Sequence, residues 1–311
     1  MAQQARIISI VFLAMLCISA CKCGQKRPPP PVPVQAQAQN PASIVQALPL
    51  EERVTIQYPE VFWLAQAEAT EESHATTENS FSQKREFHRA LLSLHSLRLI
   101  LDGSDKAYQE WTAAQLESDK LSRASFNSLH EQGRSLLASN YQGLSSAQIQ
   151  QAMETMIVLG EIGKSEKGKT LFKHHAVMAT DPEEFYEQAI TVLKNNPRLS
   201  RSFSRLPYTA KQLLQKTANL VHCQQLLQLE ATPSLFTKLK ASNLAATDPI
   251  ALSFAFFVET CKFAGTLGHV NNLSSLVYTE QAHQTMQRVA KACYLLADPM
   301  ITEFDAYNSL K

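Results

Sequence analysis

Glycine, excess charge and long apolar runs are all scarce in this sequence. Only 9 of its 311 residues are glycine, and β-branched runs are rare beside the plentiful leucine, alanine, glutamine, glutamate and serine. Because straight-chain residues favour helices and β-branched residues favour strands, this balance predicts a helical chain. The 29 basic and 28 acidic side chains leave a net charge of +1. So small an excess argues against nucleic acid as a partner, since nucleic-acid binding depends on a strongly basic surface.

The N-terminal apolar run, residues 7–18, is too short to span a bilayer stably. Arg6 precedes the run, and Ile18-Ser19-Ala20-Cys21 closes it. A basic residue, a short apolar segment and small residues before a cleavage point are typical of a secretory signal. Together they resemble a bacterial lipoprotein signal, in which an aliphatic residue and two small residues precede the acylated cysteine. Cys17 and Cys23 follow a leucine and a lysine instead, so neither has the required small residue before it.

The resemblance implies that residues 1–20 are a signal peptide and that Cys21 becomes the first residue of the mature chain. Cys21 would then carry a diacylglyceryl thioether and an N-acyl chain such as palmitate. Several acyl chains hold a protein on a membrane far more firmly than one. Lys22, in place of an aspartate, resembles outer-membrane sorting, with the rest of the chain on the periplasmic or outer side. An uncleaved anchor and a plain secretory signal are the alternatives.

The segment 21–47 is predicted to be a tether. Six of the 14 prolines lie between Pro28 and Pro41, within RPPPPVPVQAQAQNP. Such a segment is extended, polyproline-II-like and without a core of its own. We therefore expect a spacer that holds the following domain away from the membrane. The alternative is a proline-rich ligand for a partner domain.

Residues 48–311 are predicted to form one all-α globular domain of many helices. Ser145 and Gln148 form a capping box ahead of an apolar stripe. Asp181 and Asp248 each precede a proline, which is the pattern of an N-cap followed by the first helical position. No alternating strand of convincing length and no clear internal repeat accompanies these signals.

Residues 250–263 are apolar on nearly all sides, so we expect this helix at the centre of the domain, with Gly265 as its C-cap. Further helical stripes are predicted at 81–101, 185–193, 213–227 and 286–296.

A phosphate-binding loop is one interpretation of Gly163–Thr170. GKSEKGKT matches the pattern G-x-x-x-x-G-K-[ST] letter for letter, with Lys169 and Thr170 as the candidate nucleotide-binding residues. A working loop of this kind follows a buried strand and opens a helix, so that backbone N–H groups converge on the phosphates. The preceding residues have helical periodicity instead. Nucleotide binding is therefore less favoured than the two hypotheses that follow, which are a metal-dependent phosphohydrolase and a non-catalytic binding or scaffolding domain.

Leu159–Ser165, LGEIGKS, resembles the LHDIGK segment of the HD-domain metal-dependent phosphohydrolases. Residues 94–101, LHSLRLIL, resemble the helix that supplies the first histidine of that family, which makes His95 its counterpart. The resemblance implies an all-helical fold and a divalent metal ion. Gly160-Glu161 stands where the family has His-Asp, and no His-Asp dipeptide occurs in the chain. Glu161 keeps a carboxylate, but the imidazole that favours transition metals is replaced.

The other candidate metal ligands are His174, His175 and His269. The first two lie in a polar break ahead of Asp181 and titrate near neutrality, so they are candidates for a ligand or a general base. Exposed residues ahead of a helix cap are the alternative. His269 lies in the glycine- and asparagine-containing stretch 264–280, which is either the lining of a cleft or a structured loop.

Cysteine use fits an envelope protein without requiring a disulfide. After processing, Cys23, Cys223, Cys261 and Cys293 remain, and the last three fall on helices expected to be buried. Free buried thiols are the prediction, and a disulfide in an oxidising compartment is the alternative.

The sequence thus predicts a membrane-anchored bacterial lipoprotein whose helical domain binds or scaffolds a partner in the envelope and has no catalytic activity. The alternative is an HD-type phosphohydrolase whose metal is held by an unusual set of ligands: His95, Glu161, His174, His175 and His269.

Overall fold

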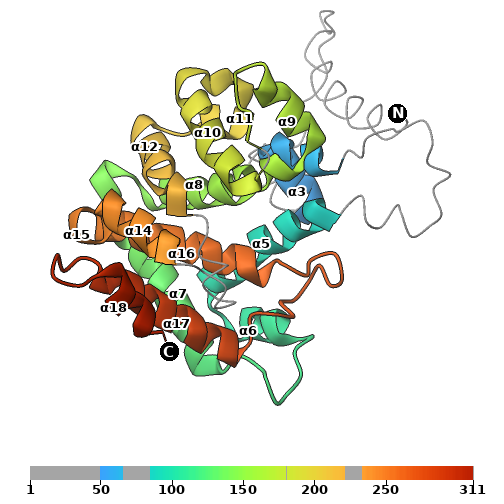
Figure 1. Ribbon diagram of the computed structural model, residues 1–311. Coiled ribbons are helices and arrows are strands. Elements are labelled where there is room, and N and C mark those ends of the chain that lie inside the picture. The colour runs from blue at the N-terminus through green and yellow to red at the C-terminus, as the bar shows by residue number, and fades with distance from the viewer. Residues whose placement is uncertain (1–49, 66–84, 180, 221–232, 311) are drawn as a thin grey trace, which may run out of the picture. The chain divides into compact units, whose positions relative to one another are not determined.

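The computed structural model describes most of the chain beyond the predicted tether (Figure 1). The described ranges are 50–65, 85–179, 181–220 and 233–310. By internal contacts the chain divides into two units, Met1–Ile44 and Val45–Lys311, and every described helix belongs to the second. The predicted signal peptide, tether and lipidated Cys21 lie outside the described residues, as do Cys23 and Cys223.

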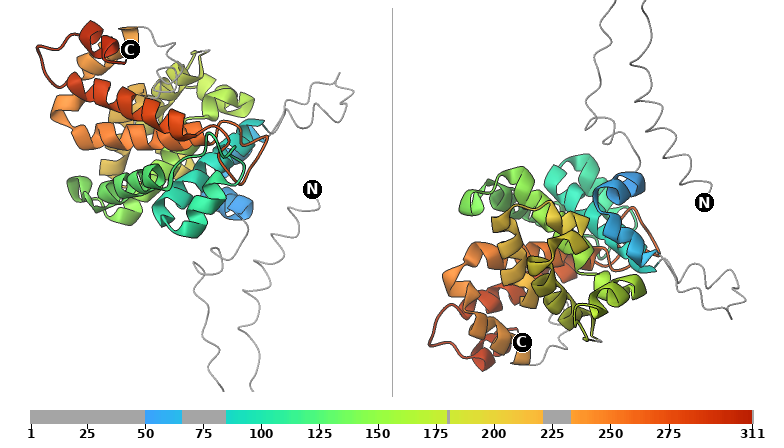
Figure 2. Two further views of the ribbon diagram at one scale, coloured as in Figure 1. Left: turned by 90° about the horizontal axis from the view of Figure 1, so that it is seen from below. Right: turned by 90° about the horizontal axis from the view of Figure 1, so that it is seen from above.

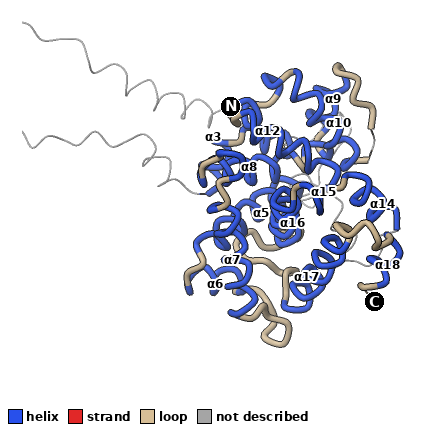
Figure 3. Tube along the Cα trace, turned by 90° about the vertical axis from the view of Figure 1, so that its left-hand side faces the viewer, coloured by secondary structure: helices blue, strands red, loops and turns tan. Residues whose placement is uncertain are grey.

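Every described element is a helix, which confirms the predicted all-α class (Figure 3). The four described ranges contain no strand. In chain order the elements are α3 (Leu50–Gln57), η1 (Pro59–Leu64), α5 (Arg85–Asp102), α6 (Asp105–Thr112), α7 (Arg123–Ala138), η2 (Tyr141–Gly143), α8 (Ser146–Leu159), η3 (Ile162–Lys164), α9 (Glu166–Lys173), α10 (Pro182–Asn195), η4 (Pro197–Leu199), α11 (Arg201–Ser204), α12 (Tyr208–Thr217), η5 (Ala218–Leu220), α14 (Pro233–Ser242), α15 (Leu244–Thr247), α16 (Pro249–Ala264), α17 (Glu280–Leu295) and α18 (Glu303–Asn308), where η marks a 3₁₀ helix.

The central helix is α16, as its apolar sequence predicts. Its N-terminus is capped by Asp248, whose side chain accepts a hydrogen bond from the Ala251 N–H at 3.2 Å, with Pro249 at the first helical position. At the other end, the Gly265 N–H donates to Cys261 O at 3.1 Å. The helix packs against α5, α7, α8, α12 and α17, and most extensively against α5. Seen from below, α16 and α17 run side by side (Figure 2).

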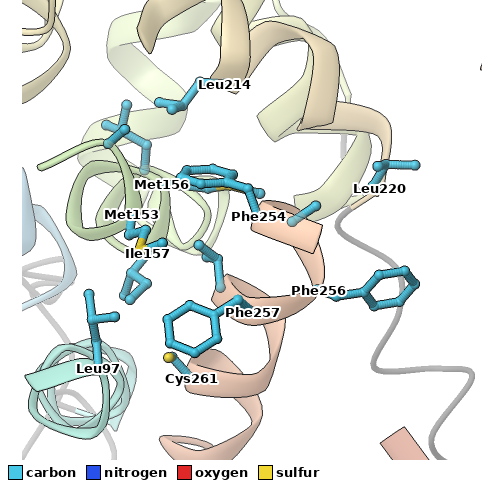
Figure 4. Packing of buried hydrophobic residues seen from close by; sticks show 14 of the residues in the cluster. Leu97, Met153, Met156, Ile157, Leu214, Leu220, Phe254, Phe256, Phe257 and Cys261 are labelled. Carbon is cyan, nitrogen blue, oxygen red and sulfur yellow. The ribbon is translucent and has the colours of Figure 1, made fainter. Parts of the chain in front are cut away.

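The core lies between α16 and the helices α5 and α8. Phe257 and Cys261 of α16 face Met153 and Ile157 of α8 and Leu97 of α5 (Figure 4). All five side chains are fully buried. Because one helix contributes apolar side chains in several directions, it fixes the positions of its neighbours at the same time.

Two glycines let the end of α16 approach α5 closely. A Cβ at Gly265 would lie 2.1 Å from Ser93 Oγ, and one at Gly268 would lie 2.3 Å from the carbonyl oxygen of His88. No side chain fits at either distance, so glycine is required at both positions. The loop after α16 therefore passes directly over the first turns of α5.

Most of the predicted helix ends are confirmed. Ser145 and Gln148 form the capping box of α8, and Asp181 accepts from the Glu184 N–H at 3.0 Å at the start of α10. The stripe predicted at 213–227 is not one continuous helix. Its first part, α12, ends at Thr217, whose hydroxyl donates to Leu213 O at 2.9 Å and so competes with the helical pattern of the last turn. The 3₁₀ turn η5 follows, and the rest of that stripe lies outside the described residues.

Cys261 and Cys293 are buried free thiols, as predicted. Burial raises the pKa of both, so neither is a reactive thiolate. Within the described part of the chain, no helix is both long and apolar enough to cross a membrane.

Candidate functional site

Glu161 lies in the turn between α8 and η3, in the middle of the predicted metal motif. The apolar stripe of α8 is buried and ends at Leu159, after which the Gly160 N–H closes the helix on Met156 O at 2.9 Å. The chain then turns into η3, which packs on α10. This turn holds Glu161 inside the protein, where only 7% of the residue is exposed.

Both oxygens of the Glu161 carboxylate are paired with lysines. Lys164 Nζ lies 2.6 Å from Oε2, and Lys262 Nζ lies 3.7 Å from Oε1. Lys262 comes from α16 and is itself only 7% exposed. Two elements far apart in the sequence therefore meet at this carboxylate.

The lysines connect Glu161 to further charges on α5 and α16. Lys164 Nζ is 3.3 Å from Glu86 Oε2, and Glu86 Oε1 is 2.8 Å from Arg89 Nη1. On the other side, Lys262 Nζ is 3.0 Å from Glu259 Oε1. We call the six side chains the Glu161 network: Arg89, Glu86, Lys164, Glu161, Lys262 and Glu259. Acids and bases alternate along it, and its formal charge is zero.

The network keeps Glu161 ionised. Burial by itself would raise the pKa of this carboxyl, but Lys262, Lys164 and Arg89 outweigh burial and bring the pKa below its ordinary value. A buried carboxylate is stable here only because cations replace the water that it has lost.

Gly160 and Glu161 both lie beside the ammonium group of Lys262. A Cβ at Gly160 would lie 3.2 Å from Lys262 Nζ and 3.0 Å from Met156 O, so a larger residue would push on the ammonium group. Gly160 and Glu161 stand at the two positions that resemble the His-Asp pair. Gly160 leaves space for the ammonium group of Lys262, and Glu161 forms an ion pair with it. A divalent cation at this carboxylate would have to displace or face two ammonium groups.

His95 belongs to a different group of side chains. Its Nε2 lies 2.8 Å from Glu110 Oε1 of α6. Burial lowers the pKa of His95, and Arg98 and Arg53 add to that effect against Glu110, which raises it. His95 is six residues beyond Arg89 on α5, or about 9 Å along the helix axis. Its partner Glu110 is not a member of the Glu161 network.

The remaining histidines are also dispersed. His174 is exposed at the C-cap of α9, and His175 lines a hollow of about 580 Å³ beside α10. His269 lies in the loop over α5, where burial, Arg85 and Arg89 lower its pKa. Among the described residues, no three histidine, cysteine or acidic side chains gather in an arrangement that could hold a metal ion.

The residues that match the phosphate-binding loop form local helical structure and pair with nearby residues. Residues Gly163–Thr170 span η3 and the first turns of α9, and the element before them is the helix α8. Ser165 Oγ accepts from the Gly168 N–H at 3.1 Å and donates to Trp63 O at 2.8 Å. Lys169 Nζ pairs with Glu166 Oε1 at 2.6 Å on the surface. The serine thus serves as a helix cap at the place where a phosphate would bind.

Sequence reasoning missed Lys262, although a signal for it was present. Glu259 and Lys262 stand three residues apart within an otherwise apolar helix. Such a pair in a buried helix needs partners, because an isolated charge inside a protein is costly. The sequence does not show which residues supply them.

Replacing Glu161 by glutamine is expected to lower the free energy of unfolding by about 1.5–3 kcal/mol at neutral pH, because it removes one of the two carboxylates beside the buried Lys262 and leaves Glu259 as its remaining partner. The folded-state pKa of Glu161 lies below the ordinary 4.5. Its stabilisation is therefore full above pH 4.5 and is lost as the pH falls through the lower, folded-state pKa. Urea unfolding of the parent and Glu161→Gln proteins should give curves whose difference shrinks on acidification.

The control is Glu166→Gln, which removes the exposed pair with Lys169 and should cost no more than about 1 kcal/mol. Equal losses of unfolding free energy in the two variants would contradict a stabilising ion pair between Glu161 and the lysines. So would a difference between the parent and Glu161→Gln that is the same at acid and neutral pH.

Comparison with known proteins gives one match. Residues 59–310 match the model of a Family of unknown function (DUF6829). No curated protein and no solved structure matches the chain. The match covers the described helices from η1 to α18, including the whole Glu161 network. The chain therefore belongs to this family of unknown function, DUF6829.

Proposed function

We propose that the protein is a bacterial lipoprotein, anchored to the cell membrane through Cys21, whose helical domain is a non-catalytic binding or scaffolding module. The observation that carries this proposal is the position of Lys262. Its ammonium group lies at the carboxylate of Glu161, beside Gly160, where the resemblance to HD-domain phosphohydrolases places two metal ligands.

The chemistry of the donors supports a structural role for this motif. Phosphoester hydrolysis in a metal-dependent enzyme needs a cation that polarises a phosphoryl oxygen or activates water. Glu161 is engaged by two lysines, and His95 is engaged by Glu110. Each of the two best-placed ligands of the resemblance is therefore held by another protein side chain.

The anchor rests on the lipobox-like Ile18-Ser19-Ala20-Cys21 and on the tether predicted at 21–47. Acylation of Cys21 would place the helical domain at a membrane surface, with the proline-rich segment as spacer. In that position the domain would meet other envelope components, and a partner protein there is the contact that a scaffold requires.

The absence of catalysis is tested on the purified full chain. We expect no stoichiometric Mn²⁺ or Mg²⁺ after dialysis, and no hydrolysis of p-nitrophenyl phosphate with either metal added, because lysines occupy the Glu161 carboxylate. Elemental analysis and product absorbance measure the two quantities. Stoichiometric metal together with phosphatase activity that disappears in Glu161→Gln would instead establish the phosphohydrolase.

The anchor is tested by Cys21→Ala. This change should move the protein from the membrane fraction to the soluble fraction and abolish labelling by a palmitate analogue, since it removes the sulfur that is acylated. Cys23→Ala is the matched control, because it removes a neighbouring thiol and should leave both results as in the parent. Membrane attachment that persists in Cys21→Ala would disprove this mode of anchoring.

A further inference from the structure

A polar cleft of about 370 Å³ opens between three helices on a part of the domain separate from the Glu161 network. Its volume lies within the roughly 300–1,000 Å³ that small-molecule sites occupy. The end of α3, the first turns of α8, and α11 form its walls. The lining residues are Gln57, Tyr58, Ala147, Gln150, Gln151, Glu154, Ser202 and Arg205.

The wall contributed by α8 is one face of that helix. Gln150 and Gln151 lie three and four residues after Ala147, and Glu154 lies four and three residues after them, which places all four on the same side. A helix face that packs against a neighbour is normally apolar. This face carries two amides and a carboxylate, so it is suited to contact a polar ligand.

The walls are held together by buried hydrogen bonds. Glu60 of η1 is 1% exposed and accepts from Ser200 Oγ at 2.7 Å and from the Ser202 N–H at 2.9 Å. The Ser202 hydroxyl donates to the other oxygen of the same carboxylate. Glu60 therefore fixes α11 against the segment that follows α3, and the cleft keeps its shape without a ligand.

Glu154 forms the base of the cleft and is itself held in place. Its Oε2 accepts from the Tyr58 hydroxyl, and its Oε1 accepts from Gln150 Nε2 at 3.2 Å. Arg98 Nε lies 3.6 Å from Oε1 and balances the carboxylate charge. At the rim, Arg205 Nη1 donates to Gln57 O at 3.3 Å.

The charges of the cleft select the class of ligand. The lining holds one carboxylate, Glu154, and one guanidinium, Arg205, so an anion meets a like charge at the first and a cation meets a like charge at the second. An apolar ligand would cover amide and carboxylate groups without replacing their hydrogen bonds to water. A neutral molecule with many hydroxyl groups avoids all three costs, because each hydroxyl both donates and accepts, as each glutamine amide does.

We infer that this cleft binds a neutral saccharide, through the amides of α8 and the Tyr58–Glu154 pair between α3 and α8. This inference rests on the proposed function and extends it, because it names the class of ligand that the binding module recognises. The glutamine amides contact adjacent hydroxyls of the sugar, Glu154 accepts from a hydroxyl at the base, and Arg205 donates at the rim.

The test uses the full chain in a polyoxyethylene detergent, which carries no sugar headgroup. Triacetylchitotriose, maltotriose and cellotriose are the probes, and binding is measured by saturation-transfer NMR and by calorimetry. We expect saturable binding of at least one probe, with inorganic phosphate unable to displace it. Saturation transfer from none of the three probes, or displacement by phosphate, overturns the inference.

Two variants locate the binding in the cleft. Ala147→Phe fills the cleft from an exposed position without removing a hydrogen-bonding group, and it should abolish saccharide binding. Gln151→Ala removes one amide and should weaken binding by about tenfold. Gln132→Ala, on α7 and equally half-buried, is the matched control and should bind as the parent does. Unchanged affinity in Ala147→Phe would place the sugar elsewhere and overturn the inference.

Mass spectrometry of the recovered probe separates this inference from the proposed function. An intact sugar agrees with both. A cleaved sugar would contradict the absence of catalysis while leaving the ligand class in place. Failure of the Cys21 anchor would likewise contradict the proposed function without affecting the affinity measured in detergent.

Discussion

Lys262 is a buried lysine on α16, the central helix of the domain. The side chains around it have to compensate the charge of its ammonium group. Lys262 lies on α16, which contacts α5, α7, α8, α12 and α17. A buried lysine without an acidic partner would lose its proton or destabilise the fold. Glu161 from the turn after α8 and Glu259 from α16 itself are the carboxylates that prevent this.

This constraint adds charged contacts between elements that apolar packing already holds together. Phe257, Met153 and Ile157 are fully buried, and their contacts are close-packed but not directional. The ion pair between Lys262 and Glu161, with Nζ and Oε1 3.7 Å apart, joins α16 to the turn after α8, and the pair between Lys164 and Glu86, 3.3 Å apart, joins that region to α5. Buried ion pairs add little net stability compared with apolar residues of the same shape, but removing one partner is costly. The Glu161 network therefore acts mainly on the arrangement of the helices.

The same interaction explains why a motif that resembles a metal site lies where it does. The turn after α8 reaches the end of α16, which is a place where groups from several helices converge. Convergence of this kind suits a metal centre when the side chains are histidine and aspartate. With Gly160, Glu161 and Lys262 it suits an ion pair. The polar cleft at α3, α8 and α11 is built from other residues, so a binding role there is compatible with a structural role for this turn.

Much of the fold could be predicted from the sequence, because caps and apolar stripes are local. Asp248 with Pro249, the Ser145 capping box and the apolar run that becomes α16 were recognisable without coordinates. The partner of Glu161 was not, because which residue faces it depends on how α16 crosses α5 and α8. The cleft was missed for the same reason, since Gln57, Gln151 and Arg205 are ordinary surface residues until the three walls come together.

The central claim is that Glu161 and Lys262 stabilise each other, and a double-mutant cycle measures this directly. The parent, Glu161→Gln, Lys262→Met and the double variant are compared by urea unfolding at neutral pH. The double variant should be more stable than the sum of the two single losses implies, with a coupling energy above about 1 kcal/mol. Losses that add to within about 0.5 kcal/mol would show that the two side chains do not interact and would contradict the account.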